Sequence, residues 1–523
     1  MKKVVYICMT VLMIFGLFIA VYAPAAETPA TSQPSKPSAD KPQYGGTLIR
    51  MQLGSSPSCM GDPSQIQGSD VIHCLPALET LIRNDEKGAP MPMLATSWSV
   101  APDMKSVTFN LRKGVKFHDG TDFNAAAVKW NITKAKTKKA DFDTITSIDV
   151  VDDYTVRMNV SKFTNGFFNI WITAPLMVSP TAFEKNGADW AKLNPVGTGP
   201  FKFVSYQRDV SVKFTKNENY WDKGKPYLDG VEIKFIADMT VGAMAFEAGE
   251  AHTLTVSEPK MAADLRDKGF KLANPTYSAG FSNLGGDSIN PESPFAKKAV
   301  REAIEYAIDK QAIMKMVGYG FYQTTYQPSP ADRLAYDPSI KGRLYNPDKA
   351  KQLLTEAGYP NGFETKMTLT QQLQNKDVYT AVQSYLGKVG INVKIDQADY
   401  TRWSKMSWDG WKSQLFGVHI GPDPNYAVTL QRHLSVGGVK DQYPSVTRPK
   451  GWADLLSKAL LTTNIKQEQL YLQEMMRLAT DDAMLCPIYY APRNVALSPK
   501  LHDDNINVWY HLTWTPELAW LSK

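Results

Sequence analysis

Few residues of this 523-residue chain have the types and spacing that chemistry on a bound molecule would need. His118 and Asp119 are adjacent, and an imidazole beside a carboxylate can act as an acid–base pair. The pair is followed by Gly120 at the end of an alternating run, where Asp-Gly is ordinary turn chemistry. We therefore expect His118 and Asp119 to make local hydrogen bonds and not to catalyse a reaction.

The chain also lacks the sequence signatures of common enzyme classes. It contains no G-x-S-x-G nucleophile elbow, no H-E-x-x-H zinc motif, no Walker loop and no glycine-rich dinucleotide fingerprint. Three pairs of neighbouring aspartates remain, but adjacent residues rarely converge on one bond, so we assign them to solvated turns and helix ends. The sequence predicts a protein that is not an enzyme and carries no cofactor. The pairs are Asp152–Asp153, Asp481–Asp482 and Asp503–Asp504.

Cys59 and Cys74 bracket a segment rich in Gly, Ser and Asp, and a disulfide between them would close that loop. Such a bond would stabilise the fold by about 3 kcal/mol and would suit an exported protein. A shared metal is a weaker alternative, because neither C-x-x-C spacing nor clustered histidines accompany the two cysteines. We predict the disulfide Cys59–Cys74, no bound metal, and a buried free thiol at Cys486.

The N-terminus has the pattern of an export signal. Lys2 and Lys3 precede an uncharged, mostly apolar run over residues 4–24, and small residues around Ala25 suit a cleavage site. We predict a signal peptide over residues 1–25, with a retained membrane anchor as the alternative, since about 20 apolar residues can span a bilayer. Pro, Ser, Thr and Ala dominate residues 26–43, which predicts a disordered spacer. The mature protein would then be periplasmic or extracellular.

A block at residues 194–236 combines a turn, a hairpin, an aromatic loop and a third strand. The G-T-G-P string at 197–200 predicts the turn, because glycine tolerates positive φ and proline fixes its own. Alternating apolar residues follow at 201–205 and 210–214, and the aromatic loop contains Tyr220 and Trp221. This block resembles one found in the family 5 solute-binding proteins of ABC importers, which bind peptides, nickel or opines.

Three further blocks resemble the same family. Residues 92–120 contain Ser97-Trp98 and end in F-H-D-G, and residues 292–318 have apolar residues at helical spacing. Asn346-Pro347 and Gly358 predict the two ends of another helix. Because four separated blocks span nearly the whole mature chain, a chance likeness is a poor explanation.

The resemblance implies an α/β fold of two lobes, the Venus-flytrap fold of periplasmic binding proteins, with a discontinuous, enlarged first lobe. We expect this first lobe to comprise residues 44–285 and 490–523, with an inserted subdomain at about 78–193. The second lobe would comprise residues 286–489.

The chain would cross between the lobes near residues 280–290 and 485–495. As the resemblance implies, such a protein closes on one solute and delivers it to a membrane permease that works with an ATPase subunit. We expect a monomer. The net charge of +6 comes without a run of five basic residues, so no nucleic-acid partner is expected. A solute-sensing module without transport would have the same sequence pattern.

From residue 365 the pattern alternates between strands and helices, which predicts a parallel sheet with ligands beyond the carboxyl ends of its strands. Topology and resemblance together favour the loop at 421–426 as the binding site. Most of the twelve tryptophans must be core, His419 can be a satisfied interior histidine, and Asp423 can simply shape a turn. The candidate ligand-binding residues are Trp403, Trp411, His419, Asp423, Asn425 and Tyr426.

Position 420 departs from the peptide-binding members. The resemblance implies an acid four positions before the proline that matches Pro424, where it holds the free amine of the ligand, but this chain has Ile420. An apolar side chain cannot pair an ammonium, and an unpaired buried charge is costly. We expect a peptide or similarly sized solute, with a sugar, an opine or a metal chelate as the alternative. His433 has no second metal ligand at suitable spacing, so direct metal binding is not expected.

Overall fold

The structure is a computed structural model that describes residues 41–523 except for residues 54–55, 67, 86–89, 140–141, 169–174, 257, 274–279, 372, 422, 437–440 and 506–513. The predicted signal peptide and residues 26–40 of the predicted spacer lie outside the described residues. Across the part that is described, no helix combines the length and apolar character needed to cross a membrane.

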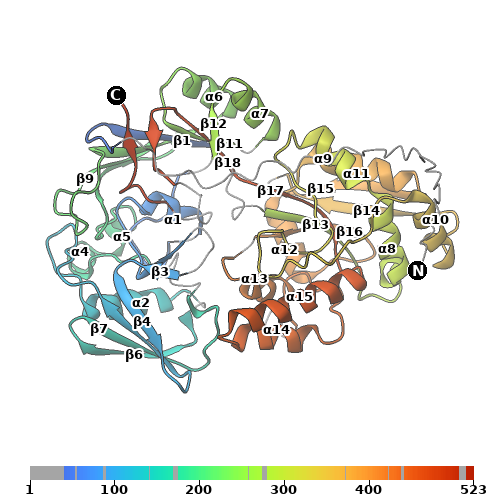
Figure 1. Cartoon of the computed structure of the whole chain (residues 1–523), viewed down its shortest axis with the longest axis horizontal. Coiled ribbons are helices and arrows are strands. Elements are labelled where there is room, and N and C mark those ends of the chain that lie inside the picture. Colours follow the sequence, from blue (N-terminus) through green and yellow to red (C-terminus); the bar gives the residue numbers. More distant parts are fainter. Residues whose placement is uncertain are drawn as a thin grey trace, which may run out of the picture.

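The chain forms two bodies that lie side by side in Figure 1, each built on a large mixed sheet. In the first body, alternating residues pack on both faces of a seven-stranded sheet. Its strands, in spatial order, are β12 (Lys271–Ala273), β18 (Asn494–Leu497), β11 (Thr253–Val256), β1 (Thr47–Leu53), β10 (Gly230–Ile236), β9 (Ser211–Lys216) and β8 (Phe201–Gln207).

The three strands predicted in the block at 194–236 are confirmed as β8, β9 and β10. Alternation explains their placement, because Val212 and Phe214 of β9 and Val231 and Ile233 of β10 are all buried in one core cluster. Helices cover both faces of this sheet, α6 and α7 against one core cluster and α1 near the other. They are α1 (Gly68–Cys74), α6 (Met239–Glu247) and α7 (Pro259–Asp267).

A smaller antiparallel sheet with its own core lies below the first sheet in Figure 1. Helix α2 packs on it through Val128 and Ile132, and Asn124 caps that helix by accepting a hydrogen bond from the Ala127 amide. Its strands and neighbours are β4 (Ala95–Val100), β5 (Ser106–Leu111), β7 (Thr155–Val160), β6 (Ile145–Asp152), α2 (Ala125–Lys136), β2 (Ile82–Asn84), β3 (Pro90–Pro92), α4 (Pro180–Asn186) and α5 (Ala188–Ala191).

The second body has a five-stranded mixed sheet, in which the parallel arrangement predicted for the strands from residue 365 is confirmed. Strands β14 and β15, and β14 and β16, are parallel, but β13 runs antiparallel to both β16 and β17. Strand β17 follows β16 through helices within residues 426–481 and runs parallel to it, so β13, which enters from the first body, is the one reversed strand of the five. The spatial order is β15 (Ile391–Gln397), β14 (Phe363–Leu369), β16 (Leu415–Ile420), β13 (Gly280–Gly286) and β17 (Cys486–Ala491).

Helices cover both faces of this second sheet. The helix predicted over residues 292–318 is divided in two, because Asp309 leaves the helical path and its carboxylate accepts from the Ala312 amide. One face carries α8 (Lys298–Ala307), α9 (Lys310–Val317), α10 (Pro347–Glu356) and α11 (Lys376–Gly387), preceded by the short η3 (Pro294–Ala296). The other carries α12 (Tyr400–Asp409), α13 (Tyr426–Leu434), α14 (Trp452–Leu461) and α15 (Ile465–Asp481).

The chain passes between the two bodies after β12 and again between β17 and β18. The second passage is short, because β17 ends at Ala491 and β18 begins at Asn494. The boundary expected at residue 285 lies inside β13, whose strand partners both belong to the second sheet. The chain then ends against the first body with the two-stranded pair β19 (Leu501–His502) and β20 (Trp520–Leu521).

The predicted disulfide between Cys59 and Cys74 is absent, and both residues are buried free thiols. Each thiol donates to a backbone carbonyl of its own segment, Cys59 to Asp62 at 3.7 Å and Cys74 to Asp70 at 3.3 Å. Sequence spacing could not reveal this, because a pair that brackets a loop need not direct its sulfurs at each other. The prediction of a buried free thiol at Cys486 is confirmed.

Candidate functional site

One edge of the second sheet gathers the segments that lead to the first body. Pairing aligns Ile420 at the end of β16 with Phe281 at the start of β13, and Phe281 with Tyr490 near the end of β17. The loop at 421–426 therefore begins at the same edge as the passages between the bodies. This is the carboxyl edge of the parallel strands β14 and β16, where ligands of α/β sheets commonly bind.

Side chains of this loop hold it in place. Asp423 is 2% exposed, its amide donates to Thr429 Oγ1 at 2.7 Å, and its carboxylate pairs with Arg432. Asn425 caps α13 by accepting from the Val428 amide, and its Nδ2 donates to Glu468 Oε1 at 3.0 Å. The loop is thus fixed to the helix that it opens and to α15.

Tyr426 and the two candidate tryptophans lie in the core of the second body. The Tyr426 hydroxyl donates to the Pro328 carbonyl, and the side chain is buried. Trp403 and Trp411 both stack on Phe416, with ring centroids 5.6 and 4.4 Å away and planes within about 15°. The two tryptophans therefore pack against one face of strand β16. This agrees with the alternative prediction that they are core residues.

His419 lies on the opposite face of β16 from Phe416. A Cβ at Gly280 would come 2.2 Å from His419 Cε1, so the imidazole lies directly on the neighbouring strand. Burial, with smaller contributions from His433 and Arg493, lowers the pKa of His419 to about 4. His419 is thus neutral at physiological pH, and its Nδ1 has no hydrogen-bond partner among the described residues.

Ile420 is 1% exposed and belongs to the core cluster with Phe281 and Tyr490. The side chain at that position offers an ammonium only hydrocarbon and no charge. Among the described residues, moreover, no group of three His, Cys, Asp or Glu side chains could hold a metal ion.

The segment after β7 brings the smaller sheet of the first body into contact with the second. The Asn165 amide donates to the Leu460 carbonyl at 2.9 Å, and its side-chain Nδ2 donates to the Ala459 carbonyl at 2.7 Å. Next to it, a Cβ at Gly166 would come 2.4 Å from Val428 Cγ2. The two bodies thus touch at α13 and α14, beside the candidate loop.

Glu468 lies at this contact and was missed from the sequence. It is 4% exposed, and burial raises its pKa to about 7, although hydrogen bonding to Asn425 and Asn165 offsets part of the rise. The sequence could have indicated Glu468, because it lies at helical spacing from Leu472 and Met475 on the buried face of α15, where a carboxylate is unusual.

Asp119 makes the local hydrogen bonds that were predicted, whereas the ring of His118 bonds to a turn that is distant in the sequence. The His118 ring contacts the Gly199 carbonyl through Nε2 at 3.0 Å and the Gly197 amide through Nδ1 at 3.3 Å. Asp119 accepts from the hydroxyl of Thr121. His118 thus holds the turn at 197–200 in place, whereas Asp119 closes its own turn at 119–121.

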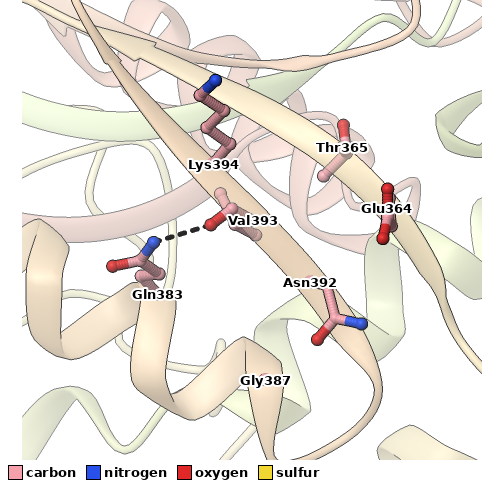
Figure 2. A pocket seen from close by; sticks show the side chains of 7 residues that line it. All are labelled: Glu364, Thr365, Gln383, Gly387, Asn392, Val393 and Lys394. Atoms are coloured by element: carbon pink, nitrogen blue, oxygen red, sulfur yellow. Dashed lines mark hydrogen bonds between the residues drawn. The ribbon is translucent and has the colours of Figure 1, made fainter.

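A separate pocket of about 410 Å³ lies between α11 and the outer strands of the second sheet. Figure 2 shows Gln383 reaching from α11 to the Val393 carbonyl, to which its Nε2 donates at 2.6 Å. The pocket is at the amino ends of β14 and β15, whereas the candidate loop follows the carboxyl end of β16, so the two are distinct. Its lining residues are Glu364, Thr365, Gln383, Gly387, Asn392, Val393 and Lys394.

Comparison with known proteins gives one family. Residues 89–438 match the family described as bacterial extracellular solute-binding proteins, family 5, middle. The glutathione-binding protein GsiB of Shigella flexneri serotype 5b is 34% identical over 320 residues. That alignment covers 59% of this chain and 61% of the length of GsiB.

Two solved structures resemble nearly the whole chain. The ABC transporter-associated periplasmic binding protein DppA from Helicobacter pylori, in complex with the peptide STSA, is 25% identical with a TM-score of 0.75 and covers 92% of this chain and 99% of that one. The binding protein AgaA from A. tumefaciens R10, in complex with agropinic acid, is 27% identical with a TM-score of 0.72 and covers 91% and 99%. The predicted two-lobed α/β fold is thereby confirmed.

Proposed function

The chain belongs to family 5 of the bacterial extracellular solute-binding proteins, and from this premise we propose that it is the solute-capturing subunit of an ABC-type importer. It holds one solute between its lobes and presents it to a membrane permease. The observation that carries this proposal is the joining of two sheets by short passages, with a fixed loop at the facing edge. Closure is then a population shift driven by a solute that contacts both lobes.

The solute is a peptide or a molecule of similar size. Support comes from the relatives, since GsiB is named for glutathione and the DppA structure contains a peptide. The solute meets the second lobe at His419 and the loop residues Asp423 and Asn425, with Tyr426 at its base. Trp403 and Trp411 contribute from behind, by fixing the strand that leads into the loop.

A second candidate is a solute without a free amine at this place. The specific observation is Ile420, whose buried side chain offers no charge to an ammonium. An opine, a sugar or a metal chelate would avoid that cost, and the AgaA structure holds agropinic acid. A module that senses the solute without transporting it is compatible with the same site.

The protein acts outside the cytoplasm as a monomer, without enzymatic activity and without nucleic acid. Support comes from the N-terminal pattern of an export signal and from DppA, which is described as periplasmic and ABC transporter-associated. Its partners are then the permease and ATPase subunits of the importer.

Native mass spectrometry of the mature protein, purified without refolding, tests the proposal. Released masses that form a ladder of amino-acid residues would identify a peptide binder that holds the amine without an acid at position 420. A single non-peptide mass would favour the second candidate. A bare protein would be screened for thermal stabilisation by peptides, opines and sugars, and stabilisation by none of them would contradict the proposed function.

A further inference from the structure

A charged side chain of the first body is buried without a hydrogen-bond partner. Arg50 of β1 is 4% exposed, and among the described residues neither its Nε nor its Nη1 has a partner. The neighbouring strand adds a second such group, because Arg50 pairs in register with Thr253 of β11. Thr253 is 0% exposed, and its Oγ1 also has no partner in the described part of the chain. Residues paired in register on parallel strands project from the same face of the sheet, so the two side chains are neighbours.

The charge of Arg50 is not balanced by an ion pair within the part of the chain that the structure describes. Burial lowers its pKa only to about 10, so the guanidinium stays charged at neutral pH. Asp504 is the acid whose charge favours it, and Asp504 Oδ1 accepts from Trp514 Nε1 at 2.6 Å. The Trp514 ring centroid lies 5.3 Å from Arg50 Cζ. Arg493, at the passage from β17 to β18, brings a second positive charge.

A neutral donor lies beside these groups. Gln52, two residues further along β1, donates from Nε2 to His73 Nε2 at 2.7 Å. Burial, with a contribution from the charge of Arg50, lowers the pKa of His73 to about 4, so the ring is neutral. A neutral imidazole that accepts at one nitrogen carries its hydrogen on the other, and His73 Nδ1 has no partner among the described residues. The unpartnered groups on this face can therefore all donate, and one of them is charged.

This combination of groups selects the chemistry of what could bind. A buried hydroxyl without a hydrogen bond is costly, and a buried charge without a counter-charge is more so. Water can accept hydrogen bonds from Arg50 and Thr253, but it cannot balance the charge. A carboxylate does both, because it is negative and accepts hydrogen bonds at both oxygens. Hydrogen bonds between arginine and a carboxylate are also among the strong ones in proteins.

The donors lie near the edge of the first sheet that leads to the second body. Strand β17 ends at Ala491 and β18 begins at Asn494, which pairs with Val256 at the end of β11 (Figure 1). Thr253 is three residues earlier on β11, so Thr253 and its partner Arg50 lie about 10 Å from this edge. It is the carboxyl edge of the parallel strands β1, β10 and β11, where ligands of α/β sheets commonly bind.

We propose that Arg50 and Thr253 form an anion subsite in the first lobe, and that this subsite takes a carboxylate of the captured solute. The carboxylate accepts hydrogen bonds from the guanidinium and from the Thr253 hydroxyl, and it balances the charge of Arg50. The inference deepens the proposed function and rests on it in one respect, the capture of a solute between the lobes. The subsite narrows the class of solute, because peptides and opines carry a carboxylate and a neutral sugar does not.

Acetate probes the subsite without knowledge of the solute. Thermal unfolding of the dialysed mature protein is recorded at neutral pH in increasing concentrations of sodium acetate, at constant ionic strength. Acetamide, a neutral molecule of nearly the same shape, is the control. A molecule that binds only the folded state raises the melting temperature in a saturable way. We expect a saturable rise with acetate and none with acetamide.

Three variants assign the effect to the subsite. Arg50→Met should bind acetate at least about tenfold more weakly. Without acetate it should melt no lower than the wild type, because an apolar side chain replaces an unbalanced buried charge. Thr253→Val removes only the hydroxyl and should weaken acetate binding by a smaller factor. Arg208→Met is the matched control, since the Arg208 side chain is 84% exposed, and it should respond to acetate as the wild type does.

Native mass spectra then connect the subsite to the solute. The wild type and Arg50→Met are purified in the same way without refolding, and the solute that co-purifies is released and identified. We expect it to carry a carboxylate, and we expect Arg50→Met to retain less of it than the wild type.

Each outcome has a definite meaning. Acetate stabilisation that is absent from the wild type, or equal in the wild type and Arg50→Met, would overturn the subsite. A lower melting temperature in Arg50→Met, together with unchanged acetate binding in Thr253→Val, would make Arg50 a structural residue and also overturn it. A neutral solute held equally by both proteins would overturn the subsite's role in capture and leave the proposed function standing. Acetate bound at Arg50 in a protein for which every solute screen fails would keep the anion subsite and overturn the proposed function.

Discussion

Glu79 shows how one buried carboxyl fixes several loops of the first lobe. It accepts hydrogen bonds from the hydroxyls of Thr198 and Tyr220, both at 2.7 Å, and from Trp221 Nε1 at 3.0 Å. Arg112 lies over the Trp221 ring at 4.2 Å. Burial raises the pKa of Glu79 to about 7, while the three hydrogen bonds oppose that shift. The turn at residues 197–200 and the aromatic loop that contains Tyr220 and Trp221 are therefore both hydrogen-bonded to Glu79.

The stability of the protein should depend on pH through this residue. Its folded pKa lies above the ordinary 4.5, so its proton stabilises the fold fully below about pH 4.5 and this contribution is lost as pH rises through 7. In Glu79→Gln the pH-dependent part disappears. Because all three partners donate to the carboxylate oxygens, an amide nitrogen in place of one oxygen breaks at least one of these hydrogen bonds, and the variant should lose about 1–3 kcal/mol. Urea unfolding at pH 5 and pH 8 measures both effects, and equal pH slopes in the two proteins would contradict this role.

Asp423 gives a second prediction at the residue scale. Asp423→Ala removes the partner of Arg432 but keeps the backbone hydrogen bond to Thr429, so the protein should stay folded while the loop loosens. We expect the co-purified solute to bind more weakly by about 1–2 kcal/mol, roughly 5–30-fold. Solute occupancy by native mass spectrometry, with a thermal melt as the folding control, measures this. Unchanged occupancy would remove the loop from the binding site.

At the scale of elements, alternation and capping signals predicted most of what the structure contains. Strands β8, β9 and β10 follow from apolar alternation, and Asn346 begins α10 as its side chain predicts. The break at Asp309 was missed because apolar spacing continues across it, and only the cap marks the end of one helix and the start of another. The parallel direction of β14, β15 and β16 was predicted from their alternation with helices, whereas the reversed direction of β13 was not, since it enters from the first body and apolar alternation carries no information on strand direction.

The location of the candidate loop in the fold could be predicted from the sequence, but the positions of its individual side chains could not. Topology located the loop after β16 correctly at the edge that leads to the first body. Trp403 and Trp411 belong to the core because both stack on Phe416. The spacing of these residues in the sequence does not reveal that tertiary contact. Glu468 was missed because its partners, Asn165 and Asn425, are about 300 and 40 residues away in the chain.

The segment around Cys59 and Cys74 gives a prediction at this scale. Burial raises the pKa of both thiols and that of Cys486, the last to about 12. The folded mature protein should therefore resist a thiol reagent at pH 8, whereas the unfolded protein should react at the three cysteines that the structure describes. Its intact mass should not change on reduction. A gain of two hydrogens would instead establish the disulfide.

At the scale of the whole molecule, Gly166 sets how closely the two bodies approach. A Cβ there would come 2.4 Å from Val428 Cγ2, a methyl on a stiff, branched side chain. Gly166→Ala should disfavour the closed form by about 1–3 kcal/mol. Spin labels on single cysteines at the exposed positions Lys129 and Lys466, measured by pulsed electron–electron double resonance, should then report fewer closed molecules.

A compensating change tests that explanation. Val428→Ala removes the methyl that the new Cβ would meet, so the double variant should regain the closed population of the wild type. Val428→Ala alone should remain closed. If Gly166→Ala closes as well as the wild type, the two bodies do not meet at this point in solution.

The order of strands in the first sheet has a consequence for how the protein is made. Strand β18 lies between β11 and β12, yet it comes from residues 494–497, more than 200 residues later in the chain. A chain emerging from its amino end therefore carries two strands with unfilled edges until almost all of it has left the ribosome. A chain truncated before residue 494 therefore cannot complete the first sheet, and its open strand edges are exposed to proteases and to other chains.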